Sequence, residues 1–486
     1  MPTRSTRARS LAALALAAGV AALAACSVNP ATGRNQLAFF SEAAEIELGA
    51  EVDRELLSNS GVYDDAELEA YVAQLGHRLA AVSERPDLPW SFRVADDEIV
   101  NAFALPGGRI YVTRGLLAHL DREAELAGVL GHEIGHVTAR HSVNALSREL
   151  VISLGLVAGL TLLDAGETAE MVGSLGMGLL FLKFGRNQER QADQLGVRYA
   201  QRAGFDPHGV VDVLRVLQAV SHAEGDGWFP VWLSTHPDPD RRWQRLGQET
   251  GLGPGPTAAE REREARLFRP RLDGLVYGQD PRNGVLEGNT WVQLRDGYQL
   301  SFPPGWRVER EGQTVAAENP AEDALVLLLP QTGRTAGEAA AAFAEAEGVV
   351  VTESGEVGSR GLPAHLVRFE TDLEDEPVTG VAVFLHTRSS RVVALVGLSS
   401  TESWPRRRAV IERAVWSLGP VVRPQHRAAE PDRLALVTLD RPMDAAEIAR
   451  RYSPHLEPWE LALLNRVAVD EPIPAGRSVK VVREGG

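Results

Sequence analysis

The stretch that most constrains the fold is ELAGVLGHEIGHVTARH, residues 125–141. Its apolar positions recur at helical spacing, so it predicts one long helix with Asp121 as its N-cap. On that helix His132 and His136 lie at i and i+4, so both imidazoles project from one face. Glu133 lies about 100° round the helix from His132. Two imidazoles that face one point can share a metal ion, and we expect a zinc site here.

A catalytic zinc site needs a third protein ligand, and the opening stretch supplies two. His141 lies at i+5 from His136, which rotates it away from the zinc face, so we expect a surface or capping histidine there. A second predicted helix, residues 185–200, carries Glu189 and Asp193 at i and i+4. We expect Glu189 to be the third ligand. Asp193 is placed to accept a hydrogen bond from a ligating imidazole and to fix its tautomer.

This arrangement of HExxH on one helix and ExxxD on the next is that of the gluzincins, and residues 95–245 resemble metallopeptidase family 48. The matching motifs are VNAFALPGGRIYVTRGLL (100–117), ELAGVLGHEIGHVTARH (125–141), NQERQADQLG (187–196) and STHPDPDRR (234–242). The resemblance implies an endopeptidase that uses one zinc ion per chain, with His132, His136 and Glu189 as metal ligands and Glu133 as general base.

The resemblance also implies how a substrate would bind. A short edge strand would lay the substrate out as an added β-strand, which suits sequence-tolerant cleavage of unfolded chains. Its residues are Asn101, Ala102, Phe103 and Ala104.

His236 lies in STHPDPDRRW, and the proline after it favours an extended or turn conformation. Two roles stay open for its imidazole. It could occupy the fourth zinc position and hold the enzyme latent until substrate displaces it, or it could hydrogen-bond the oxyanion during peptide cleavage. Arg242 is predicted to be a surface partner of a carboxylate near the site or of the substrate backbone.

The N-terminus predicts a lipoprotein signal peptide over residues 1–25. Three arginines precede a short apolar run that ends in Leu23-Ala24-Ala25-Cys26, which resembles the bacterial lipobox. Cys26 is the single cysteine of the chain and the predicted site of lipidation. Ser27 follows it, which by resemblance favours the outer membrane, with the mature protein facing the periplasm.

Length and charge limit the number of domains and the kinds of partner that the chain can have. The chain has 486 residues, too many for one ordinary core, and its net charge of −16 argues against nucleic acid as a partner. We expect an α+β fold with a mostly helical, zincin-type protease domain and a small β-sheet. The predicted parts are the protease domain over 26–255, a linker over 256–289, an α+β module of unknown role over 290–420, and a LysM-like βααβ domain over 421–486.

Two features keep alternatives open. Residues 151–163 and 171–182 are apolar but too short to cross a bilayer, so they are either buried helices or a lid over the cleft. The tail resembles a divergent LysM module, which would bind peptidoglycan or serve only for docking; Asn465 and residues 473–476 and 479–481 carry this match.

We therefore expect a zinc endopeptidase, lipid-anchored to the membrane, that hydrolyses unfolded or misassembled envelope proteins. The alternative is a chaperone or cell-wall-binding scaffold with little or no proteolysis, which the long non-catalytic C-terminal half supports.

Overall fold

The structure is a computed structural model that describes residues 26–37, 40–59, 61–148, 183–223, 235–236, 239–311, 314–331, 335–346, 348–359, 362–373, 376–387, 391–421 and 430–485. The predicted signal peptide and the two apolar segments within 151–182 lie outside the described residues. The chain divides into two compact units. The first takes in 1–54, 62–275 and 434–481, and the second takes in 55–61, 276–433 and 482–486.

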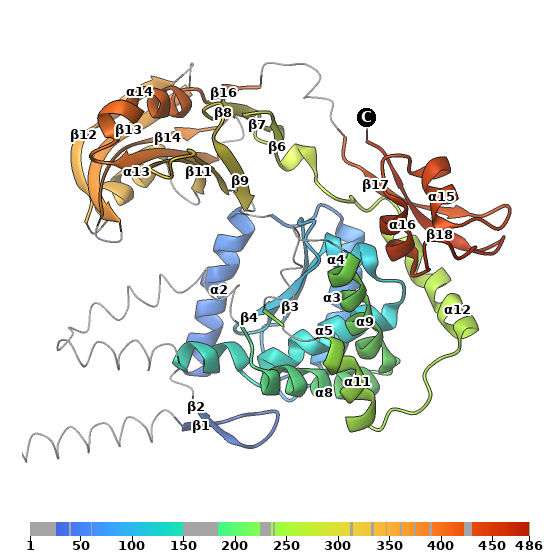
Figure 1. The fold of residues 1–486 in the computed structure, drawn as a ribbon. Helices are drawn as coiled ribbons and strands as arrows, with labels where there is room; N and C mark the ends of the chain where they lie inside the picture. The colour runs from blue at the N-terminus through green and yellow to red at the C-terminus, as the bar shows by residue number, and fades with distance from the viewer. Residues whose placement is uncertain are drawn as a thin grey trace, which may run out of the picture. The chain divides into compact units, whose positions relative to one another are not determined.

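The part of the chain that contains the zinc motif combines helices with a few short strands (Figure 1). The elements are β1 (Cys26–Val28), β2 (Asn35–Leu37), α2 (Glu42–Asn59), α3 (Ala66–Ala80), β3 (Ser91–Ala95), β4 (Ala102–Leu105), β5 (Arg109–Thr113), α4 (Arg114–His119), α5 (Glu123–Thr138), α8 (Arg186–Arg202), α9 (His208–Ala223), α11 (Pro239–Glu249) and α12 (Ala258–Phe268). The fold is mixed α+β, as the sequence predicts.

A three-stranded sheet lies beside the motif helix. Its strand order is β3-β5-β4, so β4 is an edge strand. β3 runs parallel to β5, and β4 runs antiparallel to it. A turn at Pro106-Gly107-Gly108 joins β4 to β5 in an antiparallel hairpin. Both glycines have positive φ angles, 78° and 99°, which residues with a Cβ rarely adopt.

The motif helix α5 packs closely against α8 and α9. Small residues allow this approach: a Cβ added to Gly131 would lie 3.2 Å from the Cα of Gly196 on α8. A Cβ on Gly135 would lie 3.0 Å from the carbonyl oxygen of Ala192. These distances are shorter than most Cβ contacts, so the glycines let α8, with its two acidic residues, lie close to the face of α5 that carries the histidines.

The start of α5 differs from the prediction. Arg122, rather than Asp121, is the N-cap residue. Asp121 is buried instead, and its carboxylate pairs with Arg269 at 2.8 Å and with Lys480 at 2.9 Å. The prediction failed because the partners of Asp121 lie far away in the sequence, and local spacing gave no sign of them.

The second unit is built on a seven-stranded antiparallel sheet in the order β12-β13-β14-β15-β11-β10-β9. Its strands are β9 (Arg307–Glu311), β10 (Thr314–Glu318), β11 (Ala324–Gln331), β12 (Val350–Ser359), β13 (Leu362–Leu373), β14 (Glu376–His386) and β15 (Val392–Ser400). Helices α13 (Ala336–Ala344) and α14 (Trp404–Val415) pack into separate core clusters. A four-stranded sheet adds β6 (Val285–Glu287), β7 (Thr290–Gln293), β8 (Tyr298–Ser301) and β16 (Gly419–Pro420).

The tail of the chain forms β17 (Arg433–Thr438), α15 (Ala445–Tyr452), α16 (Pro458–Asn465) and β18 (Ser478–Arg483). This strand–helix–helix–strand order agrees with the prediction, and α16 packs against α4 and α9 of the first unit. The LysM assignment and the predicted domain boundaries stay predictions. Among the described residues, no helix has the length and hydrophobicity to cross a bilayer.

Candidate metal centre

The two histidines of the motif helix face one point. The Nε2 atoms of His132 and His136 lie 3.1 Å apart, and both side chains are buried. The i, i+4 spacing on α5 produces this arrangement, as the sequence predicts.

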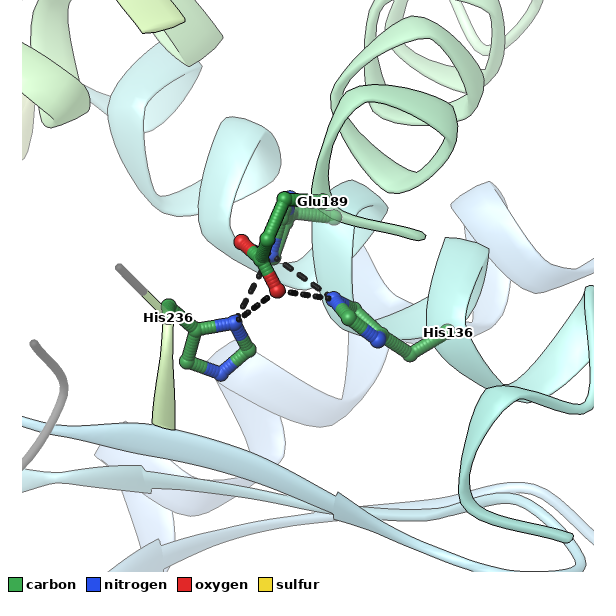
Figure 2. A group of neighbouring side chains, drawn as sticks. His136, Glu189 and His236 are labelled. Carbon is green, nitrogen blue, oxygen red and sulfur yellow. Dashed lines mark hydrogen bonds and ion pairs between the residues drawn. The ribbon is translucent and has the colours of Figure 1, made fainter. Parts of the chain in front are cut away.

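Two further residues from separate elements complete the cluster. Glu189, on the first turn of α8, places its Oε1 3.4 Å from His136 Nε2. His236 places its Nδ1 2.9 Å from the same Oε1 and 3.4 Å from His132 Nε2. Figure 2 shows His136, Glu189 and His236 pointing toward one another. One ligand atom from each of the four residues lies within 4.8 Å of every other, and all four residues are buried.

The donor set fits zinc. Three imidazole nitrogens and one carboxylate oxygen are ligands that zinc takes, and four such donors match its tetrahedral coordination. The tautomer of His132 also fits, because Asp193 Oδ1 lies 3.0 Å from its Nδ1. A proton held at Nδ1 leaves Nε2 with a lone pair that faces the centre of the cluster.

Arg242 holds the two carboxylates of α8 in place. Its guanidinium donates to both oxygens of Asp193, at 2.7 and 2.9 Å, and lies 2.6 Å from Glu189 Oε2. Burial alone would raise the pKa of both carboxyls. Arg242 outweighs burial at Asp193 and leaves its pKa below the usual range. At Glu189, His236 and Arg242 together lower the pKa below its usual range. The predicted carboxylate partner is therefore present, but the expected surface position is wrong, because Arg242 is buried.

Glu133 lies beside the cluster without joining it. Its side chain is 1% exposed, and its Oε1 has no hydrogen-bond partner among the described residues. The same oxygen lies 3.9 Å from His236 Nε2. Burial raises the pKa of Glu133 to about 8. A buried carboxyl that has an oxygen without a hydrogen-bond partner, next to a set of metal ligands, can exchange a proton with a reacting group.

The expectation for His141 is wrong. This histidine is 3% exposed, and its Nδ1 lies 3.1 Å from the Nδ1 of His136. Its Nε2 lies 3.2 Å from Gln191 Oε1 on α8. Helical periodicity would turn His141 away, but Arg140 has a positive φ of 56°, which ends the regular turn of α5. The signal that could have found it is the apolar character of the whole stretch, which places a histidine at its end inside the protein.

The predicted substrate strand lies at the open edge of the sheet. Asn101 precedes β4, and its carbonyl accepts a hydrogen bond from Thr113 N–H at 3.0 Å. Bonded and non-bonded pairs alternate along an antiparallel ladder, so the next non-bonded residues on β4 are Ala102 and Ala104. Their main-chain groups therefore point to the free edge. Phe103 turns the other way, and its ring stacks on Tyr111.

A small cavity, with room for about one water molecule, adjoins the cluster. Its polar wall is made by His132, Glu133, Asp193 and Arg242. The rest is apolar and comes from α5 and α9, through Val129, Val210, Val213, Leu214 and Leu217.

Taken together, an HExxH helix and a carboxylate ligand from a later helix define a gluzincin-type metallopeptidase domain. Residues 66–250 match the model of Peptidase family M48, whose members depend on zinc. The match includes the whole stretch from α3 through α11 and therefore every residue of the cluster.

Curated relatives carry names of the same kind. The chain is 31% identical over 263 residues to a beta-barrel assembly-enhancing protease of Yersinia pestis, covering 52% of each chain. It is 30% identical over 221 residues to the Escherichia coli protein of that name, covering 44% of this chain and 45% of the other. A mitochondrial metalloendopeptidase OMA1 of Schizosaccharomyces pombe is 35% identical over 178 residues, covering 36% of this chain and 51% of that one. The chain thus spans about half the length of these relatives.

Among solved structures, the cyanobacterial PsbP protein of Synechocystis is similar to 28% of this chain and 95% of its own. The identity is 13% and the TM-score 0.24, which is too low for a shared function to follow.

Proposed function

We propose that this protein is a zinc-dependent endopeptidase of the cell envelope that cleaves unfolded or misassembled envelope proteins. The observation that carries the proposal is the convergence of four buried ligand atoms within 4.8 Å, with Glu133 next to them. A scaffold that only binds polypeptides does not need a buried carboxyl beside a set of metal ligands. The relatives' names, which refer to proteolysis and to β-barrel assembly, support envelope proteins as substrates.

In this proposal His132, His136 and Glu189 hold one zinc ion. When bound there, zinc supplies a Lewis acid that polarises the scissile carbonyl and lowers the pKa of the attacking water. Glu133 takes a proton from that water and passes it to the leaving amine. Arg242 and Asp193 are positioning residues, because they fix the orientations of Glu189 and His132.

His236 takes the fourth ligand position in the resting enzyme in this proposal. Support comes from its Nδ1, which lies among the ligand atoms, and from its burial. The alternative role, a hydrogen bond to the oxyanion, would use the Nε2 that faces Glu133 at 3.9 Å. Both roles require the side chain to lie at the cluster, but only the first makes it a barrier to substrate.

Substrate binding follows from the edge strand. An extended polypeptide would add to β4 through the main chains of Ala102 and Ala104, which favours unfolded segments over folded ones. A binding mode made of main-chain hydrogen bonds suits many sequences, as a protease of misassembled proteins needs.

The anchor is part of the same proposal. Cleavage after residue 25 and acylation of Cys26 would tie the protein to the periplasmic face of the outer membrane. The lipobox-like sequence supports this. Peptidoglycan, as a ligand of the tail, would be a second contact with the envelope.

The catalytic proposal is tested by Glu133→Gln. This variant keeps the ligands, so we expect full zinc content and an unchanged fold, with casein cleavage reduced ~10²-fold or more because the proton shuttle is lost. Atomic absorption measures the zinc content, and a casein digestion assay measures the rate of cleavage. Loss of zinc from this variant, or an unchanged rate, would contradict the role given to Glu133.

The anchor is tested by Cys26→Ser. Without the thiol no acyl chain can be attached, so we expect the protein to move from the membrane fraction to the soluble periplasm. Fractionation and immunoblotting of both forms measure this. A variant that stays with the membranes would remove the lipoprotein proposal and leave the catalytic one intact.

A further inference from the structure

His141 lies at the metal centre, but it has no role in the proposed reaction. It contacts His136, and the contact joins the two Nδ1 atoms, on the side of His136 that faces away from Glu189. The two Nδ1 atoms lie 3.1 Å apart, which is hydrogen-bond distance, and the rings meet edge-on at an interplanar angle of 80°.

The ring of His136 is held on both sides. Its Nε2 faces Glu189 and His132, and its Nδ1 faces His141. Phe184 packs against the ring at 4.1 Å between centroids. Among the described residues, the hydrogen-bond partner of His136 Nδ1 is His141 Nδ1.

The direction of the hydrogen bonds follows from the metal site. A histidine that binds a metal through Nε2 carries its proton on Nδ1. His136 must then donate to Nδ1 of His141, which must hold a lone pair there. A neutral His141 with a lone pair on Nδ1 carries its proton on Nε2 and donates it to Gln191 Oε1 at 3.2 Å. The chain ends at an amide oxygen, which can only accept.

The reverse direction is incompatible with the metal site. If the amide of Gln191 were turned to donate to His141, His141 would donate from Nδ1 to His136, whose proton would then sit on Nε2. That proton would point into the ligand cluster and occupy the lone pair that binds the metal. The orientation of one amide on α8 therefore decides whether His136 can act as a ligand.

The backbone is built to bring His141 to this place. Arg140 has the left-handed conformation that ends α5, and its guanidinium is held by Glu45 at 2.9 Å and by the carbonyl of Phe40 at 2.7 Å. A non-glycine residue at positive φ costs about 1 kcal/mol or more, so the two contacts must offset it. This break in the helix places His141 beside the Nδ1 of His136.

We propose that His141 and Gln191 form a hydrogen-bond relay that fixes His136 in the tautomer that binds zinc, so that both are positioning residues of the metal centre. The inference rests on the proposed zinc site but concerns residues outside the ligand set. It replaces the expectation of a surface or capping role for His141.

The first test measures zinc affinity by competition with a chelator of known affinity. His141→Phe keeps an aromatic ring but removes both nitrogens, and we expect zinc Kd to rise about 10- to 100-fold. Gln191→Leu should raise it in the same direction, whereas Gln191→Glu, which can only accept a hydrogen bond when ionised, should keep it near the wild-type value. Gln194→Leu is the matched control: it makes the same change one turn along α8, where the side chain contacts Glu249 and not the relay.

The second test reads the tautomers directly. In the zinc-loaded protein, nitrogen NMR of the imidazoles should show His136 protonated at Nδ1 and His141 protonated at Nε2. A structural role for His141 would not fix its proton at Nε2. Either a His141→Phe variant that folds and binds zinc within twofold of wild type, or a His141 that carries its proton on Nδ1, would overturn the proposal.

These outcomes are separable from the proposed function. Zinc affinity and tautomer are measured without any substrate, so a protein that binds zinc as described but leaves casein intact would refute the protease and keep the relay. Normal proteolysis with unchanged zinc affinity in the His141 and Gln191 variants would do the opposite.

Discussion

At the scale of single residues, the burial of His236 determines what its removal should do. If His236 occupies a coordination position that the substrate needs, the site is open only when the side chain swings away. A site blocked nine-tenths of the time would react about tenfold faster once the block is removed. We therefore expect His236→Ala to cleave casein about tenfold faster than wild type and to keep its zinc, because His132, His136 and Glu189 remain.

Two other results would mean something else. Slower cleavage with zinc retained would identify His236 as an oxyanion donor, since such a donor contributes to the rate and not to metal binding. A variant equal to wild type in both rate and zinc content would place His236 outside the machinery. His208→Ala is a suitable control, because this histidine is bonded to Asp206 and Gly253 and has no contact with the cluster.

The residues that sequence reasoning placed at the metal centre are those whose relations are local. His132 and His136 are related by one helical turn, as are Glu189 and Asp193, so their shared faces follow from periodicity alone. His141 was misplaced because one residue, Arg140, departs from helical φ. The spacing of apolar residues does not predict a single left-handed residue. The contact between the two helices was available only through the resemblance to a known family.

At the scale of elements, the edge strand β4 can be tested without disturbing the metal site. The main chain of Ala104 points to the free edge, so its N–H is not needed by β5. Proline at that position removes one hydrogen-bond donor and is tolerated on an edge strand whose N–H faces outward. We expect Ala104→Pro to lower kcat/KM for casein by about 2- to 10-fold, as the loss of one hydrogen bond predicts, with zinc content unchanged.

Ala104→Val serves as the control for this strand. It adds bulk and keeps the N–H, so a rate near that of wild type assigns the proline effect to the lost hydrogen bond. If the valine variant is as slow as the proline variant, the side chain and not the main chain matters. Equal rates for all three proteins would show that substrate does not add to β4.

The elements around the centre were predictable because each has a strong local signal. The glycines of the β4–β5 turn and Gly204, which has a positive φ of 77° after α8, mark the ends of their elements. The packing of α8 on α5 was not predictable in the same way. It depends on a close contact between Gly131 on α5 and Gly196 on α8. Neither sequence segment indicates that it packs against the other.

At the scale of the whole chain, the tail completes the charge balance at the start of the motif helix. Lys480 is 1% exposed and donates to the carbonyls of Ala118 and Leu120 as well as pairing with Asp121. Arg466 pairs with Glu125 at 2.5 and 2.7 Å. Without the tail, both carboxylates would lose cations that now face them in a buried setting. Sequence reasoning could not find these pairs, which join residues more than 340 positions apart.

The tail is therefore expected to stabilise the protease domain itself. Arg466→Leu leaves Glu125, a fully buried carboxylate, without its closest cation, and breaking such a pair costs about 3–5 kcal/mol. We predict a loss of this size at pH 7 in urea unfolding, with the tail and the motif helix unfolding in one transition. Arg451→Leu is the control, because its pair with Asp440 is solvent-exposed and worth at most about 1 kcal/mol.

The dependence of this loss on pH has a defined sign. Burial would raise the pKa of Glu125, but Arg466 outweighs it, and the pKa lies below its usual range in the folded protein. A carboxyl with a lowered folded pKa contributes stability above its unfolded pKa, about 4.3, and loses it as pH falls through the folded value. The unfolded chains bind protons alike at this carboxyl, so the gap in unfolding free energy between wild type and Arg466→Leu depends on Glu125 in the two folded proteins. Without Arg466, burial raises the pKa of Glu125, so the gap should be largest at neutral pH and above. It should shrink as pH falls from the pKa of Glu125 in the folded variant to its pKa in the folded wild type. A gap that is under 1 kcal/mol at pH 7, or that grows on acidification, would show that the tail is an independent module whose charges do not support the motif helix.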